Sequence, residues 1–356
     1  MKKIFTSILC AALSFAAVCG AAACADTPSE GKAQLSFAGS LQELYGGTDG
    51  YPQAVIVAKT SVIENDPGAV ARVESLMAGS ADFLASTVPF EIASLLSSCY
   101  APDLAPSFNA NNLTAQVIAN CSVKYTPAAT CKETVKEFLT ALKGMDGDLV
   151  KHEPEEAFFY AGGTATWVPT NSYNVYAPDG APALALANAI SQSRIAGGSS
   201  GVGFTFHVVA SDEIRLQVTG TSPAADFCIL PVNLAANLLW NGENYKMLGT
   251  VTNGNMFLLS TSTDLPEITK TNIASLKGKK VGVIQLANVP GLTLRLSLEK
   301  AGISYKILNE SDASLDPEKV NLAAVTPNDV TLAGGYDYFL CPEPAASAKV
   351  KATAAK

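Results

Sequence analysis

The sequence predicts an α/β chain with two lobes, each a mixed, mostly parallel sheet flanked by helices. From Trp167 onward, strand-like and helix-like segments alternate, which is typical of α/β layers. A strand–turn–helix phrase occurs twice, as "ADFCILPVNLAANLL" (225–239) and "YDYFLCPEPAASAKV" (336–350). Without an N-terminal leader the chain keeps roughly 330 residues, which is too long for one typical domain.

The repeated phrase marks equivalent places in two similar lobes. Before its first copy, "SYNVYA" predicts a strand and "PDGAPALALANAISQS" a helix, with Pro182 in the first turn. After Leu265 the pattern restarts. "NIASLKGKKVGVI" predicts a short helix and a strand, and "NVPGLTLRLSLEKAG" predicts a helix closed by Gly302.

The N-terminal part supplies a strand, "AQLSFAG" (33–39), that has no neighbour of its own nearby. A lobe of this kind needs a strand after its last helix, so we expect 33–39 to share a sheet with the strand at 336–341. "AVIVAKTSVIENDPGAV" then predicts a strand and a long helix, started by Asn65, Asp66 and Pro67.

Both lobes resemble bacterial ABC-transporter solute-binding proteins of the type II periplasmic-binding fold, in the group that binds sulfonates, nitrate and thiamine precursors. The matching segments are "PDGAPALA", "LPVNLAANL", "LKGKKVGVIQLANVPGL", "CPEPAA", "AVIVAKTSVIENDPGAV" and "EPEEAFFY". The last two come first in this chain, so the resemblance implies a circular permutation. The break lies between the helix near Lys356 and the strand near Ala33, at a surface turn that tolerates new termini.

This permuted order implies the domain boundaries. One lobe spans 58–260, and the other is assembled from 33–57 and 261–356. Residues 1–24 are expected to be a signal peptide and 25–32 a linker.

The N-terminal segment predicts export. Lys2 and Lys3 precede an apolar stretch that ends in small residues, as in secretory signals. Ala23-Cys24-Ala25 fits ordinary cleavage, whereas "AAAC" resembles the bacterial lipobox and implies lipidation of Cys24. We therefore expect a monomer on the extracytoplasmic face of the membrane, anchored only through Cys24, or in the periplasm.

The charge argues against a nucleic-acid partner. Removing Lys2 and Lys3 changes the formal net charge from −8 to −10, and no Lys/Arg cluster is present. No later apolar run is long enough to cross a membrane. With two histidines and no CxxC pair, neither a metal site nor a cofactor is expected. Cys121 and Cys131 could form a disulfide, or they could be unpaired small hydrophobes.

The predicted ligand site lies beyond the carboxyl ends of the strands, where open α/β sheets bind ligands. Helix starts there offer unpaired N–H groups, and Gly180 and Gly291 allow close backbone approach. The predicted contacts are Asp179, Gly180, Ala181, Asn233, Asn288, Val289, Pro290, Gly291 and Glu343, with Tyr51, Pro52 and Gln53 on the hinge side of the cleft.

Some of these residues have alternative roles. Asp179 could be only a helix cap, and Glu343 could be a ligand contact, a tie between the lobes or a solvated residue. No Arg or Lys falls in these turns, and Arg295 is expected to point to solvent. The ligand is therefore expected to be neutral, aromatic or weakly charged, since a doubly charged anion usually recruits Arg.

The function implied by the resemblance is capture of a small organic molecule for an ABC permease. The alternatives are an enzyme of the same fold, similar to the thiamine-pyrimidine synthases, or a surface sensor that transports nothing. Those enzymes depend on a His and a Cys cluster, and neither His152 nor His207 falls in a predicted cleft turn. Since common hydrolase motifs are absent too, we do not expect an enzyme.

Overall fold

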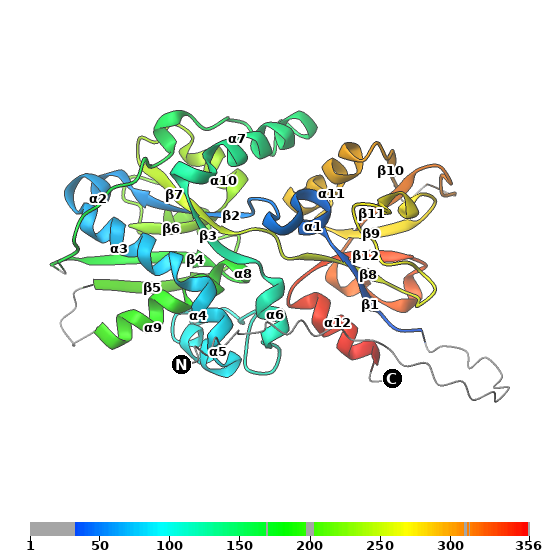
Figure 1. Cartoon of the computed structure of the whole chain (residues 1–356), viewed down its shortest axis with the longest axis horizontal. Coiled ribbons are helices and arrows are strands. Elements are labelled where there is room, and N and C mark those ends of the chain that lie inside the picture. The colour runs from blue at the N-terminus through cyan, green and yellow to red at the C-terminus, as the bar shows by residue number, and fades with distance from the viewer. Residues whose placement is uncertain (1–32, 169, 197–202, 310–311, 313, 355–356) are drawn as a thin grey trace, which may run out of the picture. The chain divides into compact units, whose positions relative to one another are not determined.

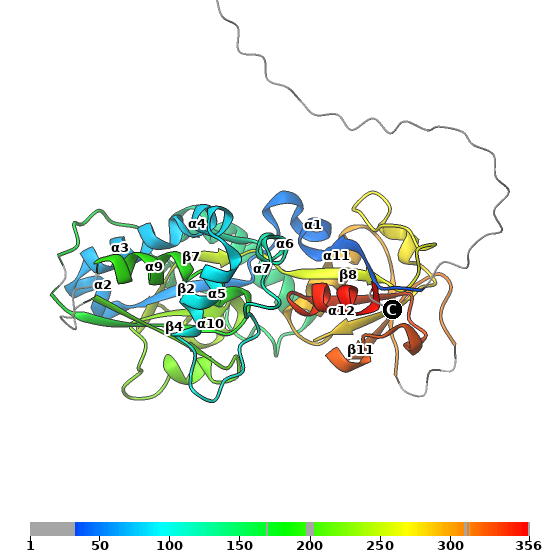
Figure 2. The same cartoon turned by 90° about the horizontal axis from the view of Figure 1, so that it is seen from below.

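Two six-stranded mixed sheets, each flanked by helices, form the architecture (Figures 1 and 2). The computed structural model describes residues 33–354 except 169, 197–202, 310–311 and 313. The predicted signal peptide, the linker and Cys24 lie outside these residues. Ala33–Lys356 form one compact unit. The α/β class and the presence of two mixed sheets are as predicted.

The first sheet has the order β3-β7-β2-β6-β4-β5. Strands β4, β5 and β6 are parallel, and β2 runs antiparallel between β6 and β7. Its strands are β2 (Ala54–Lys59), β3 (Val123–Pro127), β4 (Ser172–Pro178), β5 (Gly203–Val209), β6 (Phe227–Pro231) and β7 (Tyr245–Thr252).

The second sheet has the order β1-β8-β12-β9-β11-β10. The predicted sharing of a sheet between the N-terminal strand and the strand at 336–341 is confirmed. The two are not direct neighbours, because antiparallel β8 lies between them. The strands are β1 (Ser36–Ser40), β8 (Met256–Ser260), β9 (Lys280–Ile284), β10 (Tyr305–Ile307), β11 (Val320–Val325) and β12 (Tyr338–Pro342).

Both sheets share one strand order. Five strands of the first sheet run β5-β4-β6-β2-β7, and the corresponding five of the second run β11-β9-β12-β8-β1. In each sheet, the fourth position is an antiparallel strand, β2 or β8, which the chain enters directly after crossing over from the other sheet. Strands β6 and β12 hold the same place, which explains why the strand–turn–helix phrase occurs twice.

The helices divide between two halves of the molecule. The first half comprises β2–β7 with α2 (Thr60–Asn65), α3 (Pro67–Ala78), α4 (Ser80–Ser86), α5 (Pro89–Ser97), α6 (Ala115–Asn120), α7 (Ala128–Met145), α8 (Ala181–Leu184), α9 (Ala187–Ala196) and α10 (Val232–Leu239). The second half comprises β1 and β8–β12 with α1 (Leu41–Gly46), α11 (Val289–Lys300) and α12 (Ala345–Ala354). Short 3-10 turns are η1 (Gly47–Asp49), η2 (Glu156–Phe158), η3 (Ile214–Gln217), η4 (Ile273–Leu276), η5 (Pro327–Asp329) and η6 (Leu332–Gly334).

Local signals set several helix boundaries. Asp66 caps α3 by accepting from the Ala69 N–H at 3.0 Å, and Pro67 occupies the first turn. Gly302 follows α11 with φ +70°, and the Ile303 N–H donates to the Leu298 carbonyl at 2.9 Å. That bond is typical of a Schellman motif, so the predicted closure at Gly302 is confirmed.

The apolar core follows the strand periodicity. On β2, Val55 and Val57 face a cluster with α7 and α10, whereas Ile56 faces α3, α4, α5 and α9. The first of these clusters continues through Tyr51 and Phe138 into the second half, where α1 and α11 cover its sheet. Packing on this side therefore joins the two halves.

The predicted lobe boundaries were wrong at two strands. The chain crosses between the sheets at 41–53 and again at 253–255. The boundary predicted at 57/58 cuts through β2, which belongs wholly to the first sheet. Strand β8, predicted within 58–260, belongs to the second sheet. Each crossing leads into an antiparallel strand, β2 or β8, and the amino-acid sequence of such a strand does not indicate which sheet it joins.

The beginning and end of the described chain are neighbours. The Leu35 N–H, just before β1, donates to the Thr353 hydroxyl at the end of α12 at 3.0 Å. The second half is therefore assembled from both chain ends, as predicted.

The possible Cys121–Cys131 disulfide is not formed. Both thiols are free, and they lie in different clusters, Cys121 with α6 and Cys131 with α7. Burial raises the pKa of both thiols. They pack as small buried hydrophobes, which was the other interpretation. In the described ranges, no helix combines the length and the apolar character that crossing a membrane requires.

Candidate functional site at the junction of the sheets

The predicted contacts at helix starts lie in four turns at carboxyl ends of strands, where β4 leads into α8, β6 into α10, β9 toward α11 and β12 into α12. Two of these ends meet the chain crossings. The Val232 N–H after β6 donates to the Gln53 carbonyl, and the Glu343 N–H after β12 donates to the Asn255 carbonyl, each at 3.0 Å. The carboxyl ends of β6 and β12 therefore adjoin the two crossings.

Glu343 ties the two halves together. Glu343 is 3% exposed, and its carboxylate accepts from Asn120 Nδ2 of α6 at 2.6 Å and from the Ser347 hydroxyl at 2.8 Å. The Ser347 N–H adds a third bond at 3.2 Å. Of the three roles considered from the sequence, the interlobe tie is the one observed.

Asp179 is engaged within its own half. Its carboxylate accepts from the Tyr100 hydroxyl at 3.0 Å, the Ser107 hydroxyl at 2.6 Å, the Ser107 N–H and the Gly180 N–H. These four donors use the lone pairs of the carboxylate, so Asp179 is fully partnered within its own half. Gly180 adopts φ +101°, and Ala181 is buried. Through the bonds of Asp179, this turn holds the segment around Ser107 in place.

The turn before α11 leaves one polar side chain available. Val289, Pro290 and Gly291 are buried, and a Cβ on Gly291 would collide with the backbone of Leu286. Gly291 therefore allows the close approach of the chain's own backbone at Leu286. Asn288 is exposed and makes no side-chain capping bond.

Asn233 holds the corresponding position at the start of α10. Its side chain is half-buried and has no hydrogen-bond partner among the residues that the structure describes. Asn233 and Asn288 thus bring an unengaged carboxamide from each half to a helix start at a carboxyl edge. Carboxamides both donate and accept, and helix starts add N–H donors.

The crossings themselves bury polar atoms. Gln53 Nε2 donates to Asn255 Oδ1 at 2.8 Å and so links the two crossings. Within the described chain, the Tyr51 hydroxyl, Gln53 Oε1 and Thr252 hydroxyl are buried without a hydrogen-bond partner. Burial raises the pKa of Tyr51, so its hydroxyl stays protonated. These atoms keep unused hydrogen-bonding capacity beside the junction.

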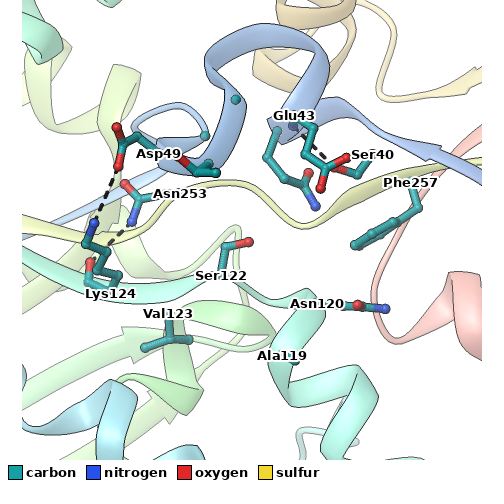
Figure 3. A pocket seen from close by; sticks show the side chains of 14 residues that line it. Ser40, Glu43, Asp49, Ala119, Asn120, Ser122, Val123, Lys124, Asn253 and Phe257 are labelled. Carbon is teal, nitrogen blue, oxygen red and sulfur yellow. Dashed lines mark hydrogen bonds and ion pairs between the residues drawn. The ribbon is translucent and has the colours of Figure 1, made fainter. Parts of the chain in front are cut away.

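A pocket of about 390 Å³ lies along the same junction (Figure 3). Lys124 pairs with Asp49 at 3.5 Å, and Asn253 Nδ2 donates to the Lys124 carbonyl at 3.2 Å. The lining residues are Ser40, Gln42, Glu43, Gly47, Thr48, Asp49, Gly50, Ala119, Asn120, Ser122, Val123, Lys124, Asn253 and Phe257. This set was not predicted from the sequence, because it comes from β1, α1, η1, α6, β3 and β8 and contains no motif.

The remaining candidates lie elsewhere. Arg295 was expected in solvent, but it is half-buried, and its Nε donates to the Tyr305 hydroxyl at 3.1 Å. His152 stacks on Trp240, and His207 stacks on Tyr176. In the described ranges, no group of three or more His, Cys, Asp or Glu could hold a metal ion.

Comparison of the chain with family models, with curated proteins and with solved structures found no match. No family is therefore assigned to the chain on that ground.

Proposed function

We propose that the protein is an extracytoplasmic solute-binding protein that captures a small organic molecule between its halves and delivers it to an ABC importer. The observation that supports this most is the shared strand order of two sheets connected by two crossings at their carboxyl edges. Such an arrangement suits a clamp, because ligand contacts from both halves favour a closed state.

The permuted periplasmic-binding fold is part of this proposal. The last strand position of the second sheet is filled by β1 from the N-terminus, next to the end of α12. Joining Thr353 to Leu35 would make the second half continuous, as the family's order requires. In this permuted order the Gly-containing segment "FFYAGGTATW" (158–167), which leads from η2 toward β4, would join the family's original ends.

The proposed ligand contacts are Asn233 and Asn288, with Gln53 at the crossing. The two nearby carboxylates, Asp179 and Glu343, are already satisfied by donors of the chain. The side chains left available are neutral carboxamides, which supports a neutral, aromatic or weakly charged solute with both donor and acceptor groups.

A thermal-shift screen of small neutral metabolites on the full chain tests the proposal. A ligand at 100 times its Kd stabilises the folded state by about 2.7 kcal/mol, which raises the melting temperature. Product formation during incubation would favour the enzyme instead. A panel without any shift, repeated by calorimetry, would contradict solute capture.

Variants then test the contacts. Asn233→Ala and Asn288→Ala should each weaken binding by roughly 5- to 150-fold, through loss of a polar contact worth about 1–3 kcal/mol. Arg295→Ala removes a polar side chain from α11, the helix that follows Asn288, and should bind the ligand normally. Loss of binding in Arg295→Ala alone would place the site elsewhere.

A further inference from the structure

The two sides of the junction are held together by different kinds of contact. On one side, α7 of the first half packs against α11 of the second (Figure 1). Phe138 of α7 is 1% exposed, and its ring centroid lies 5.3 Å from that of Tyr45 and 5.7 Å from that of Tyr51. Lys300 covers Tyr45 from outside, with Nζ 3.7 Å from the ring centroid.

Separation on this side would expose a large apolar area. Phe138 and Tyr51 belong to the cluster that runs through both halves, and aromatic side chains dominate the energetics of such contacts. We therefore expect the α7–α11 side to stay closed.

The opposite side is held by the Asn120–Glu343 hydrogen bond between α6 and the turn before α12. Gln116 orients Asn120 by donating to its Oδ1 at 2.8 Å. If this bond breaks, Glu343 keeps both donors from Ser347, and the half-buried Asn120 can reach water. Opening here leaves no buried charge without partners, so it is far easier than opening on the other side.

We propose that the Asn120–Glu343 bond is a latch, and that the halves open on the α6–α12 side by pivoting about the α7–α11 contact. The motion would widen the pocket of Figure 3, because Asn120 is one of its lining residues. This inference concerns the free chain and holds whether or not a solute is captured.

Distance measurements on the full chain test the latch. Pairs of bio-orthogonal spin labels would be placed at Ala115 and Lys351 across the latch side, and at Thr140 and Ala301 across the pivot side. All four positions are exposed. In Asn120→Ala, the ratio of long to short Ala115–Lys351 distances should rise roughly tenfold or more, as expected for loss of a charge-assisted hydrogen bond. The Thr140–Ala301 distances should not change.

Further variants sharpen the result. Asn120→Asp places a second carboxylate against Glu343 and should open the latch side further than Ala does. Asn111→Ala, an exposed asparagine in the segment before α6, is the matched control and should behave as the parent chain. Equal lengthening of both pairs in Asn120→Ala would overturn the pivot. Unchanged distances, or failure of both Asn120 variants to fold, would overturn the latch.

Discussion

Gly50→Ala should destabilise the protein by distorting one crossing against the other. Gly50 adopts φ +65°, where an alanine is strained by about 1–2 kcal/mol. An added Cβ would also collide with the carbonyl oxygen of Asn253 and lie 3.2 Å from its Cβ. That carbonyl accepts from the Tyr51 N–H at 3.2 Å, so relief of the collision weakens a bond between the crossings. Together these effects should lower the free energy of unfolding by about 3 kcal/mol or more.

Two other glycines separate the contributions. Gly302 has φ +70° and no atom near the position of a Cβ, so Gly302→Ala should show only the backbone strain, about 1–2 kcal/mol. Gly147 has open space and no positive φ, so Gly147→Ala should be neutral or stabilise by about 0.4–1 kcal/mol.

Urea unfolding of the full chain, followed by circular dichroism, measures the series. The expected order of stability is Gly147→Ala, then Gly302→Ala, then Gly50→Ala, with unchanged denaturant slopes. If Gly50→Ala and Gly302→Ala lost equal stability, the close contact between the crossings would be refuted.

Two further predictions concern the first half. Asp66→Ala should lower stability by about 1–2 kcal/mol in urea unfolding, since Asp66 caps α3 and also accepts from the Tyr173 hydroxyl; Asp66→Asn, which keeps an acceptor, should lose less. The Glu156 carboxylate accepts hydrogen bonds from Lys136, which has the larger effect, and from Lys132, and these bonds lower its pKa from 4.5 to about 2. The stabilisation is therefore present above pH 4.5 and is lost as pH falls toward 2. The small difference in free energy of unfolding between the parent chain and Glu156→Gln should vanish over that range, and also in high salt. A difference that does not depend on pH would contradict the pairing.

The sequence predicted the repeated architecture well, because that signal is local. The strands before Pro231 and Pro342 are short apolar runs, and each proline turn is followed by a helix. The N-terminal strand could be placed in the second sheet because the repeat left one position there unfilled. The insertion of β8 between β1 and β12 was not predictable, since pairing across some 220 residues depends on tertiary packing.

The boundary errors have the same origin. Strand β2 is apolar on both faces, as a central strand must be, and nothing in such a run says which sheet it enters. The pocket of Figure 3 was missed for a related reason. Its side chains come from three strands of the two sheets, the short helices α1 and α6 and the 3-10 turn η1, which come together only once both crossings are in place.

Hydrogen-bond satisfaction explains why the carboxylates at the site have partners within the chain. Asp179 and Glu343 were predicted as ligand contacts because they lie in turns that lead into helices. A carboxylate at such a turn attracts nearby backbone and hydroxyl donors, and both residues are satisfied by the chain. A carboxamide attracts those donors less strongly, so Asn233 and Asn288 remain unengaged at the same edges. The polar groups left available at these edges are therefore the neutral ones, and the carboxylates instead fix the loop around Ser107 and the contact between the halves.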